Sequence, residues 1–295
     1  ADNNTAIGTY ALSANVNGIG NVATGVNALS QNTSGDYNAA YGTNSLYTNT
    51  SGDENTASGY GALFSNISGK DNAAFGKYAL YSNTADYNTA LGFNAMFFNT
   101  SGTNNTATGS IALQNNTTSS NNTANGYAAL YSNNGGNENT AIGTSSLYAN
   151  ILGSHNTATG FGSLNKNTAD DNTANGAYAL YENTTGSNNT GVGYEALYKN
   201  TTGSYNTATG LGALTFNTSG SSNTAHGYKS LYSNTTGVNN TATGVTALYN
   251  NTIGTGNTAT GLEALFFNTE GNNNTATGLS DNKYSKLSIS KHERL

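Results

Sequence analysis

Few residues in this sequence have the types and spacing that catalysis requires. The three histidines, His155, His226 and His292, occupy different places in the sequence pattern, and the chain has no cysteine. Asp170 and Asp171 are adjacent in a stretch of turn-forming residues, where successive side chains need not converge. Nucleophiles, bases and metal sites all depend on such convergence. We therefore expect a protein that is not an enzyme and holds no cofactor.

A cluster of carboxylates offers the clearest metal chemistry. It comprises Asp36, Asp53, Glu54, Asp71 and Asp86. Stacked carboxylates could share Ca²⁺, which takes oxygen ligands. Because no glycine–aspartate calcium repeat persists along the chain, we instead favour a solvated acidic edge that keeps neighbouring molecules apart.

The elements that position these residues follow from a tandem repeat. The segment Asn206–Ser222, NTATGLGALTFNTSGSS, defines positions 1 to 17, and this frame recurs sixteen times from Asn4 to Asn273. A partial copy follows at Asn274–Leu279, and two copies, Asn72–Tyr87 and Asn156–Asp171, have sixteen residues. So short a period predicts a solenoid in which each copy forms one coil.

The repeat favours strands over helices, because Asn, Thr and Gly are poor helix formers. We predict a strand at positions 1–4, a bend at Gly of position 5, and a second strand at positions 8–11. Positions 12–17 then form the return turn, in which Gly of position 15 takes a positive φ. The prediction is an all-β parallel β-solenoid (β-roll) of about seventeen coils, roughly 80 Å long at a spacing of about 4.8 Å per coil.

The least variable positions predict the interior. Position 9 is Leu in every full copy except at Met96, position 3 is Ala except at Gly191, and positions 1 and 12 are always Asn. We expect Leu and Ala to fill a narrow core. The two Asn columns should form inward amide ladders, each side chain bonded to its neighbours above and below.

Position 10 carries an aromatic column that adjoins the inward Leu and should therefore point outward. Its members are Tyr47, Phe64, Tyr81, Phe97, Tyr131, Tyr148, Tyr181, Tyr198, Tyr232, Tyr249 and Phe266. Such a column suits packing against sister chains, stacking on a glycan, or simple exposure, and we favour packing because a long apolar stripe in water is unusual.

Threonine and asparagine supply two weaker patterns. Thr-x-Thr pairs at positions 2 and 4, as in Thr157 and Thr159, suggest an ice-binding face, but Tyr41, Phe75 and His226 interrupt the array. Position 12 lies in many Asn-x-Ser/Thr sequons, which an inward asparagine would make inaccessible to glycosylation.

Composition narrows the functional class. The net charge is −6 with only 8% charged residues, so a nucleic-acid partner is not expected. No apolar run approaches the about 20 residues of a membrane span. The low charge, the abundance of Asn, Thr and Gly, and a start inside the repeat register without Met or a signal segment favour a processed extracellular or virion-surface chain.

The repeat register divides the chain into an array, residues 1–279, and a tail, residues 280–295. Within the tail Leu287 and Ile289 alternate with serines, which is a short strand pattern. The tail would either cap the last coil or dock on the next molecule, and the second alternative predicts an open filament.

The core NTAxGxxAL, as in Asn4–Leu12 and Asn88–Met96, resembles the head repeats of trimeric autotransporter adhesins and the NTA-rich tail-fibre repeats of viruses and bacteria. The resemblance covers Asn4 to Leu279. It implies a left-handed parallel β-roll, three rolls side by side, and a surface used for attachment.

Two functional hypotheses follow. The first is a structural subunit of an extracellular fibre that self-associates, as a homo-oligomer, trimer or homopolymer, through the aromatic column and its chain ends. The second is an adhesin or tail-fibre shaft whose variable positions 6, 7, 11, 16 and 17 contact a surface glycan or receptor. Ice binding is a lesser alternative. In negative-stain images, long filaments support the first hypothesis and discrete particles the second.

Overall fold

The computed structural model describes residues 2–280, so the tail positions Leu287 and Ile289 lie outside the described residues. The chain divides into two compact units, Ala1–Asn156 and Thr157–Leu295. Each unit is an all-β parallel solenoid whose coils have about seventeen residues, as the repeat predicts. Among residues 2–280 there is no helix, and hence none with the length and hydropathy of a membrane span.

Every coil contributes one strand of three residues. In the N-terminal unit the strands are β1 Thr5–Ile7, β2 Val22–Thr24, β3 Ala39–Tyr41, β4 Thr56–Ser58, β5 Ala73–Phe75, β6 Thr89–Leu91, β7 Thr106–Thr108, β8 Thr123–Asn125 and β9 Thr140–Ile142. In the C-terminal unit they are β10 Thr157–Thr159, β11 Thr173–Asn175, β12 Thr190–Val192, β13 Thr207–Thr209, β14 Thr224–His226, β15 Thr241–Thr243, β16 Thr258–Thr260 and β17 Thr275–Thr277.

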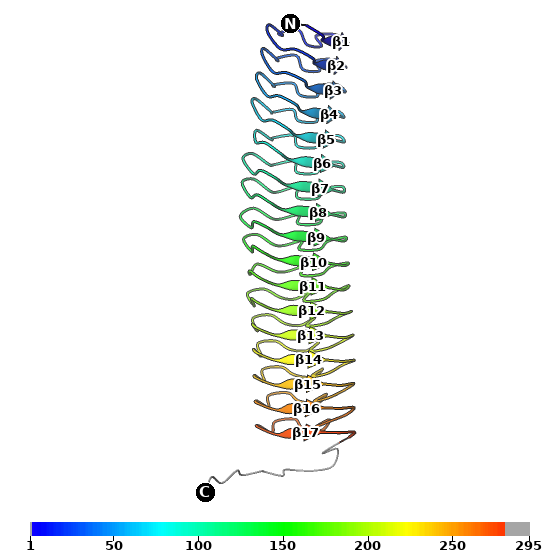
Figure 1. Cartoon of the computed structure of the whole chain (residues 1–295), viewed down its shortest axis with the longest axis vertical. Helices are drawn as coiled ribbons and strands as arrows, with labels where there is room; N and C mark the ends of the chain where they lie inside the picture. Colours follow the sequence, from blue (N-terminus) through cyan, green and yellow to red (C-terminus); the bar gives the residue numbers. More distant parts are fainter. Residues whose placement is uncertain (1, 281–295) are drawn as a thin grey trace. The chain divides into compact units, whose positions relative to one another are not determined.

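Within each unit every strand pairs in parallel with the strand of the next coil, so that equivalent positions lie side by side (Figure 1). Ala40 of β3 is paired with Ala57 of β4, and Ala242 of β15 with Ala259 of β16. The register holds across the shorter coil as well, where Ala74 pairs with Ala90. The repeat period therefore stacks like side chains into columns.

The predicted second strand at positions 8–11 is wrong. Positions 7 and 9 both have a left-handed backbone, with φ of 59° at Asn44 and 49° at Leu46, and these two residues bend the chain instead of extending it. The bent segment still bonds to the next coil, because the Leu46 N–H donates to the Ala62 carbonyl at 3.0 Å. Inter-coil hydrogen bonds thus continue where no strand exists.

The predicted reason for glycine at position 15 is also wrong. A positive φ occurs at position 17, for example 54° at Tyr37, and not at position 15. Close packing favours glycine there, although Ser119 occupies the position in one full-length coil. A Cβ on Gly52 would lie 2.4 Å from Asn49 Oδ1 and 2.4 Å from the Gly69 carbonyl oxygen of the next coil.

The predicted interior is confirmed. In the coil that begins at Asn38, the side chains of Ala40, Leu46 and Asn49 are fully buried. Position 8 completes this core as Ala or Ser, here Ser45. The core of this coil is therefore two small residues, one leucine and two asparagines, and the interior coils repeat it, with Met96 in place of leucine in one of them.

Candidate functional site

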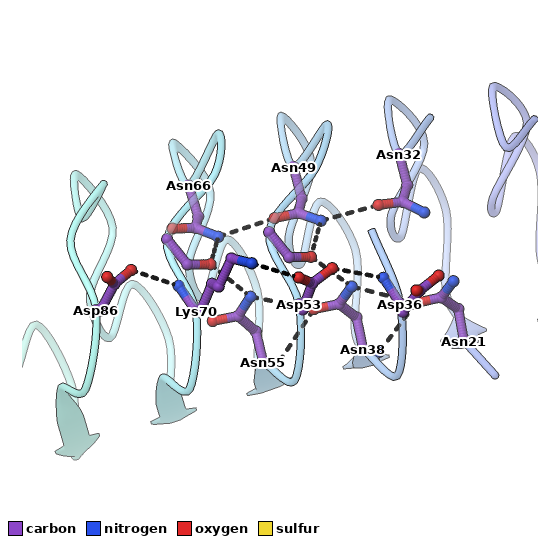
Figure 2. A network of polar contacts seen from close by, with 12 residues as sticks. Asn21, Asn32, Asp36, Asn38, Asn49, Asp53, Asn55, Asn66, Lys70 and Asp86 are labelled. Carbon is purple, nitrogen blue, oxygen red and sulfur yellow. Dashed lines mark hydrogen bonds and ion pairs between the residues drawn. The ribbon is translucent and has the colours of Figure 1, made fainter. Parts of the chain in front are cut away.

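The two asparagine columns form connected amide ladders (Figure 2). At position 12, Asn49 Nδ2 donates to Asn32 Oδ1 at 2.9 Å and to the Gly52 carbonyl at 3.0 Å. At position 1, Asn38 Nδ2 donates to the same Gly52 carbonyl at 2.7 Å and to Asn21 Oδ1 at 3.2 Å. The carbonyl of position 15 thus joins the ladders, which are structural and closed to ligands.

The acidic edge has a structural function that was not predicted from the sequence. Carboxylates at position 16 accept the backbone N–H of the preceding coil, as Asp53 Oδ1 does from Asp36 at 3.0 Å and Asp86 Oδ1 does from Lys70 at 2.8 Å (Figure 2). Lys70 Nζ also lies 2.7 Å from Asp53 Oδ2. Among residues 2–280, no three acidic or histidine side chains gather closely enough to share a metal ion.

The environment of Asp53 shifts its ionisation. Burial alone would raise the pKa of Asp53, but the hydrogen bond and charge of Lys70 and the backbone N–H of Asp36 outweigh it and lower that pKa. The bond from Asp53 in turn raises the pKa of Lys70. The pair therefore stays ionised over a widened pH range.

The aromatic residues of position 10 do come together, as stacked rings. Centroids lie 5.1 Å apart for Tyr47 and Phe64, 5.0 Å for Phe64 and Tyr81, and 5.1 Å for Tyr232 and Tyr249. Interplanar angles are 13°, 9° and 13° in these pairs. Ten of the eleven rings are half-buried, and only Tyr148 is exposed. The rings pack on their own copies along the chain.

Neighbouring positions extend this surface. Tyr178 of position 7 meets Phe161 of position 6 at 5.2 Å and Tyr181 of position 10 at 5.6 Å, both edge-on. Phe216 of position 11 meets Tyr232 edge-on at 5.0 Å. The side chains at positions 6, 7, 10 and 11 therefore form one surface, which we call the aromatic face.

The aromatic face contains most of the exposed apolar side chains of the C-terminal unit. Nine of the eleven large apolar side chains exposed among residues 157–280 lie at positions 6 and 11. They are Phe161, Tyr194, Leu211, Phe216, Tyr228, Val245, Leu262, Phe267 and Leu279. So concentrated an exposed apolar surface is typical of an interface.

Lysines on the aromatic face lie over its rings. Lys77 Nζ is 5.0 Å from the centroid of Tyr78, and Lys199 Nζ is 5.1 Å from that of Tyr198. These distances allow cation–π attraction. Desolvation, together with the nearby charge of Glu182, raises the pKa of Tyr198. The face is thus apolar at its rings and carries isolated charges among them.

The remaining candidate residues are dispersed. His226 is exposed on β14, and His155 Nε2 lies 3.6 Å from Glu138 Oε2 at the surface. The side chains of Thr241 and Thr243 point outward while Ala242 is buried, but Asn175, Val192 and His226 interrupt this threonine face. The prediction that position 12 is buried inside its sequons is confirmed, as at Asn32 and Asn200.

The ring column is predictable from the sequence, whereas the apolar character of position 6 was not predicted. The signal was present, since eleven coils carry a large apolar residue there that proves exposed, yet no single residue type dominates and Lys77 and Thr43 interrupt it. The predicted interface residues Leu287 and Ile289 lie outside the described residues.

No family model, curated protein or solved structure matches this chain. The solenoid fold therefore rests on the structure alone, and the resemblance to adhesin and tail-fibre repeats stays a prediction.

Proposed function

We propose that this chain is a structural subunit of an extracellular fibre and that it self-associates through the aromatic face. The observation that carries the proposal is the exposed apolar surface at positions 6 and 11, next to rings already stacked along the chain. An apolar surface of this regularity gains free energy when a second surface covers it. A second copy has the same axial repeat and can match it coil for coil.

Ring geometry favours self-association over binding of a glycan. A sugar stacks on the face of an aromatic ring, as one ring stacks on another. Within an unbroken run of the position 10 column those faces are covered by neighbouring rings, as between Tyr249 and Phe266 at 5.1 Å and 8°. Stacking within these runs leaves less ring face for a sugar, which favours the side chains of a partner protein. Attachment to a surface glycan remains the second hypothesis.

End-to-end contact through residues 280–295 would extend such an assembly, and it stays a prediction because residues 281–295 lie outside the described residues. The adhesin resemblance implies a more specific lateral assembly, a trimer of parallel rolls. Extracellular location belongs to the same proposal and rests on the low charge and high Asn, Thr and Gly content.

Sedimentation velocity and negative-stain microscopy test the proposal. Leu211 and Leu262 of position 6 are replaced by serine together, and the control replaces Ile253, which is equally exposed but lies at position 14. We expect the double variant to reduce the assembled fraction and the Ile253→Ser control to leave it unchanged. Discrete single-chain particles for the unchanged protein, together with binding to a glycan array, would support the attachment hypothesis instead.

A further inference from the structure

The aromatic face of the C-terminal unit is pseudo-symmetric about its fourth coil, Asn206–Ser222. The coil before it carries Tyr194 and Tyr198 at positions 6 and 10, and the coil after it carries Tyr228 and Tyr232 at the same positions. Tyr194 and Tyr228 are 47% and 46% exposed, so the two coils present equivalent surfaces. One coil further out, Tyr181 and Tyr249 continue the match at position 10.

The charges at position 7 break this symmetry in a complementary way. Glu195 occupies position 7 before the central coil, and Lys229 occupies it after. Lys229 Nζ lies 5.0 Å from the ring centroid of Tyr232, and Glu195 bonds to the hydroxyl of Tyr194. Lys229 also bonds to the hydroxyl of Tyr228, so a tyrosine holds each charge on the face. Among residues 2–280 neither half-buried charge has a counter-charge.

We propose that the partner on this face is a second copy of the chain, packed antiparallel about a two-fold axis through the Asn206–Ser222 coil. In such an isologous contact each column faces the same column of the second copy. The coil before the axis then faces the coil after the axis in the second copy. Glu195 then faces Lys229 of the second copy, and the contact occurs twice. This inference rests on the proposed self-association and specifies its geometry.

Among two-fold axes that pass through a coil, charge selects the register, and only the central one pairs Glu195 with Lys229. An axis one coil earlier sets Glu195 against its own copy and Lys199 against its own copy, and an axis one coil later sets Lys229 against its own copy. Like charges in such positions disfavour both registers. At the central coil the column residues are the small Gly212 at position 7 and Thr215 at position 10, so no charge lies on the axis.

Charge reversal tests the pairing in the full-length protein. Glu195→Lys and Lys229→Glu each make two attractive contacts repulsive. Each should therefore raise the dissociation constant of the dimer by about tenfold or more, as measured by sedimentation equilibrium. The double variant, which carries both substitutions, restores both contacts. Its dissociation constant should lie within about twofold of that of the unchanged protein. Lys199→Glu, on the same face but opposite Ser233, is the matched control and should change it far less. Circular dichroism checks that each variant is folded.

Cross-linking tests the position of the two-fold axis. Because the chain has no native cysteine, a thiol reagent reacts only with the cysteine that is introduced. A cysteine at Leu211, in the central coil, should link to its own copy through a thiol reagent about 10 Å long, the usual spacing of packed sheets. A cysteine at Leu262, three coils away, should not, because its copy then lies roughly 29 Å along the axis at about 4.8 Å per coil.

Restoration by the double exchange, with linking at 211 and not at 262, supports the antiparallel dimer. Equal linking at both sites indicates a parallel arrangement and overturns it, as does a double exchange that restores nothing. If the protein self-associates and none of these substitutions changes its dissociation constant, the antiparallel geometry is wrong but the proposed function is not contradicted. A chain that stays monomeric overturns both.

Discussion

The glycine at position 15 shows how closely neighbouring coils approach at the joined amide ladders. A Cβ on Gly52 would lie 2.4 Å from Asn49 Oδ1, whose position is fixed by the amide of Asn66 at 2.8 Å. In the sixteen-residue coil Ala85 takes this place, and its carbonyl accepts from Asn72 and Asn83 at 2.8 Å each. One full-length coil carries a side chain there as well, at Ser119, whose hydroxyl is buried without a hydrogen-bond partner. A side chain at position 15 is therefore tolerated in a full-length turn, but its polar group finds no partner.

Replacing Gly52 by alanine should lower the free energy of unfolding by about 2–4 kcal/mol, since it combines overpacking with displacement of a buried amide. Ser51→Ala, one residue earlier and exposed, is the control and should stay within about 0.5 kcal/mol. Urea denaturation measures both. If Gly52→Ala proves as mild as Ser51→Ala, the steric account of position 15 fails.

The ion pair of Asp53 and Lys70 makes the stability of the acidic edge depend on pH. The folded pKa of Asp53 is lowered, so its stabilisation is present above the unfolded pKa of about 3.9 and disappears as pH falls through the folded value. The raised pKa of Lys70 works in the opposite range, because its stabilisation is lost only as pH rises above about 10.4.

Asp53→Asn should therefore cost less than about 1 kcal/mol at pH 7, and the difference from the unchanged protein should shrink as pH falls below about 4. The amide oxygen still accepts the Asp36 N–H, as Asn137 Oδ1 does from Ser120 at 2.8 Å. Asp53→Ala removes that acceptor too and should cost more at every pH. Thermal melts between pH 2 and 9 measure these differences in stability. If the loss caused by Asp53→Asn does not depend on pH, the ion pair is not its cause.

At the scale of the coil, the sequence was informative wherever one residue type repeats. Invariant Asn and near-invariant Leu predicted the ladders and the core. The second strand was predicted wrongly because Leu46 and its equivalents take a left-handed backbone that leucine rarely adopts, so Leu followed by an aromatic residue looked like an extended strand. The flanks of the aromatic face were missed because their apolar character is shared among Val, Tyr, Phe and Leu.

The leucine column holds each coil to its neighbours, and Leu147 in β9's coil is fully buried. Leu147→Ala should cost about 2–5 kcal/mol, and Leu147→Asp more, because an unpaired charge cannot be solvated in that core. Lys199→Gln, at an exposed position 11, should stay within about 0.5 kcal/mol. Equal losses at 147 and 199 in chemical denaturation would contradict the inward assignment of position 9.

At the scale of the whole molecule, stability is a sum over coils and the contacts between neighbours, so a coil is a removable unit. In the N-terminal unit the coil Asn105–Asn121 carries Gln114 at position 10, which separates the ring runs that end at Phe97 and begin at Tyr131. Removing it would bring those two rings into adjacent coils and join the runs.

Deleting residues 105–121 should therefore leave the protein folded, with unchanged strand content in far-ultraviolet circular dichroism and a near-ultraviolet signal strengthened by the longer ring stack. Deleting only residues 105–113 leaves residues 114–121, which are too few for a coil, so the junction between the coils that begin at Asn88 and Asn122 is mismatched while later coils keep register with one another. This deletion should therefore lower the melting temperature and make unfolding of that unit less cooperative. The two deletions differ in length by less than half a coil, so the register, and not the amount of chain removed, is what separates them. If both proteins melt alike, the coils are not held by their columns and the additive description of this solenoid is wrong.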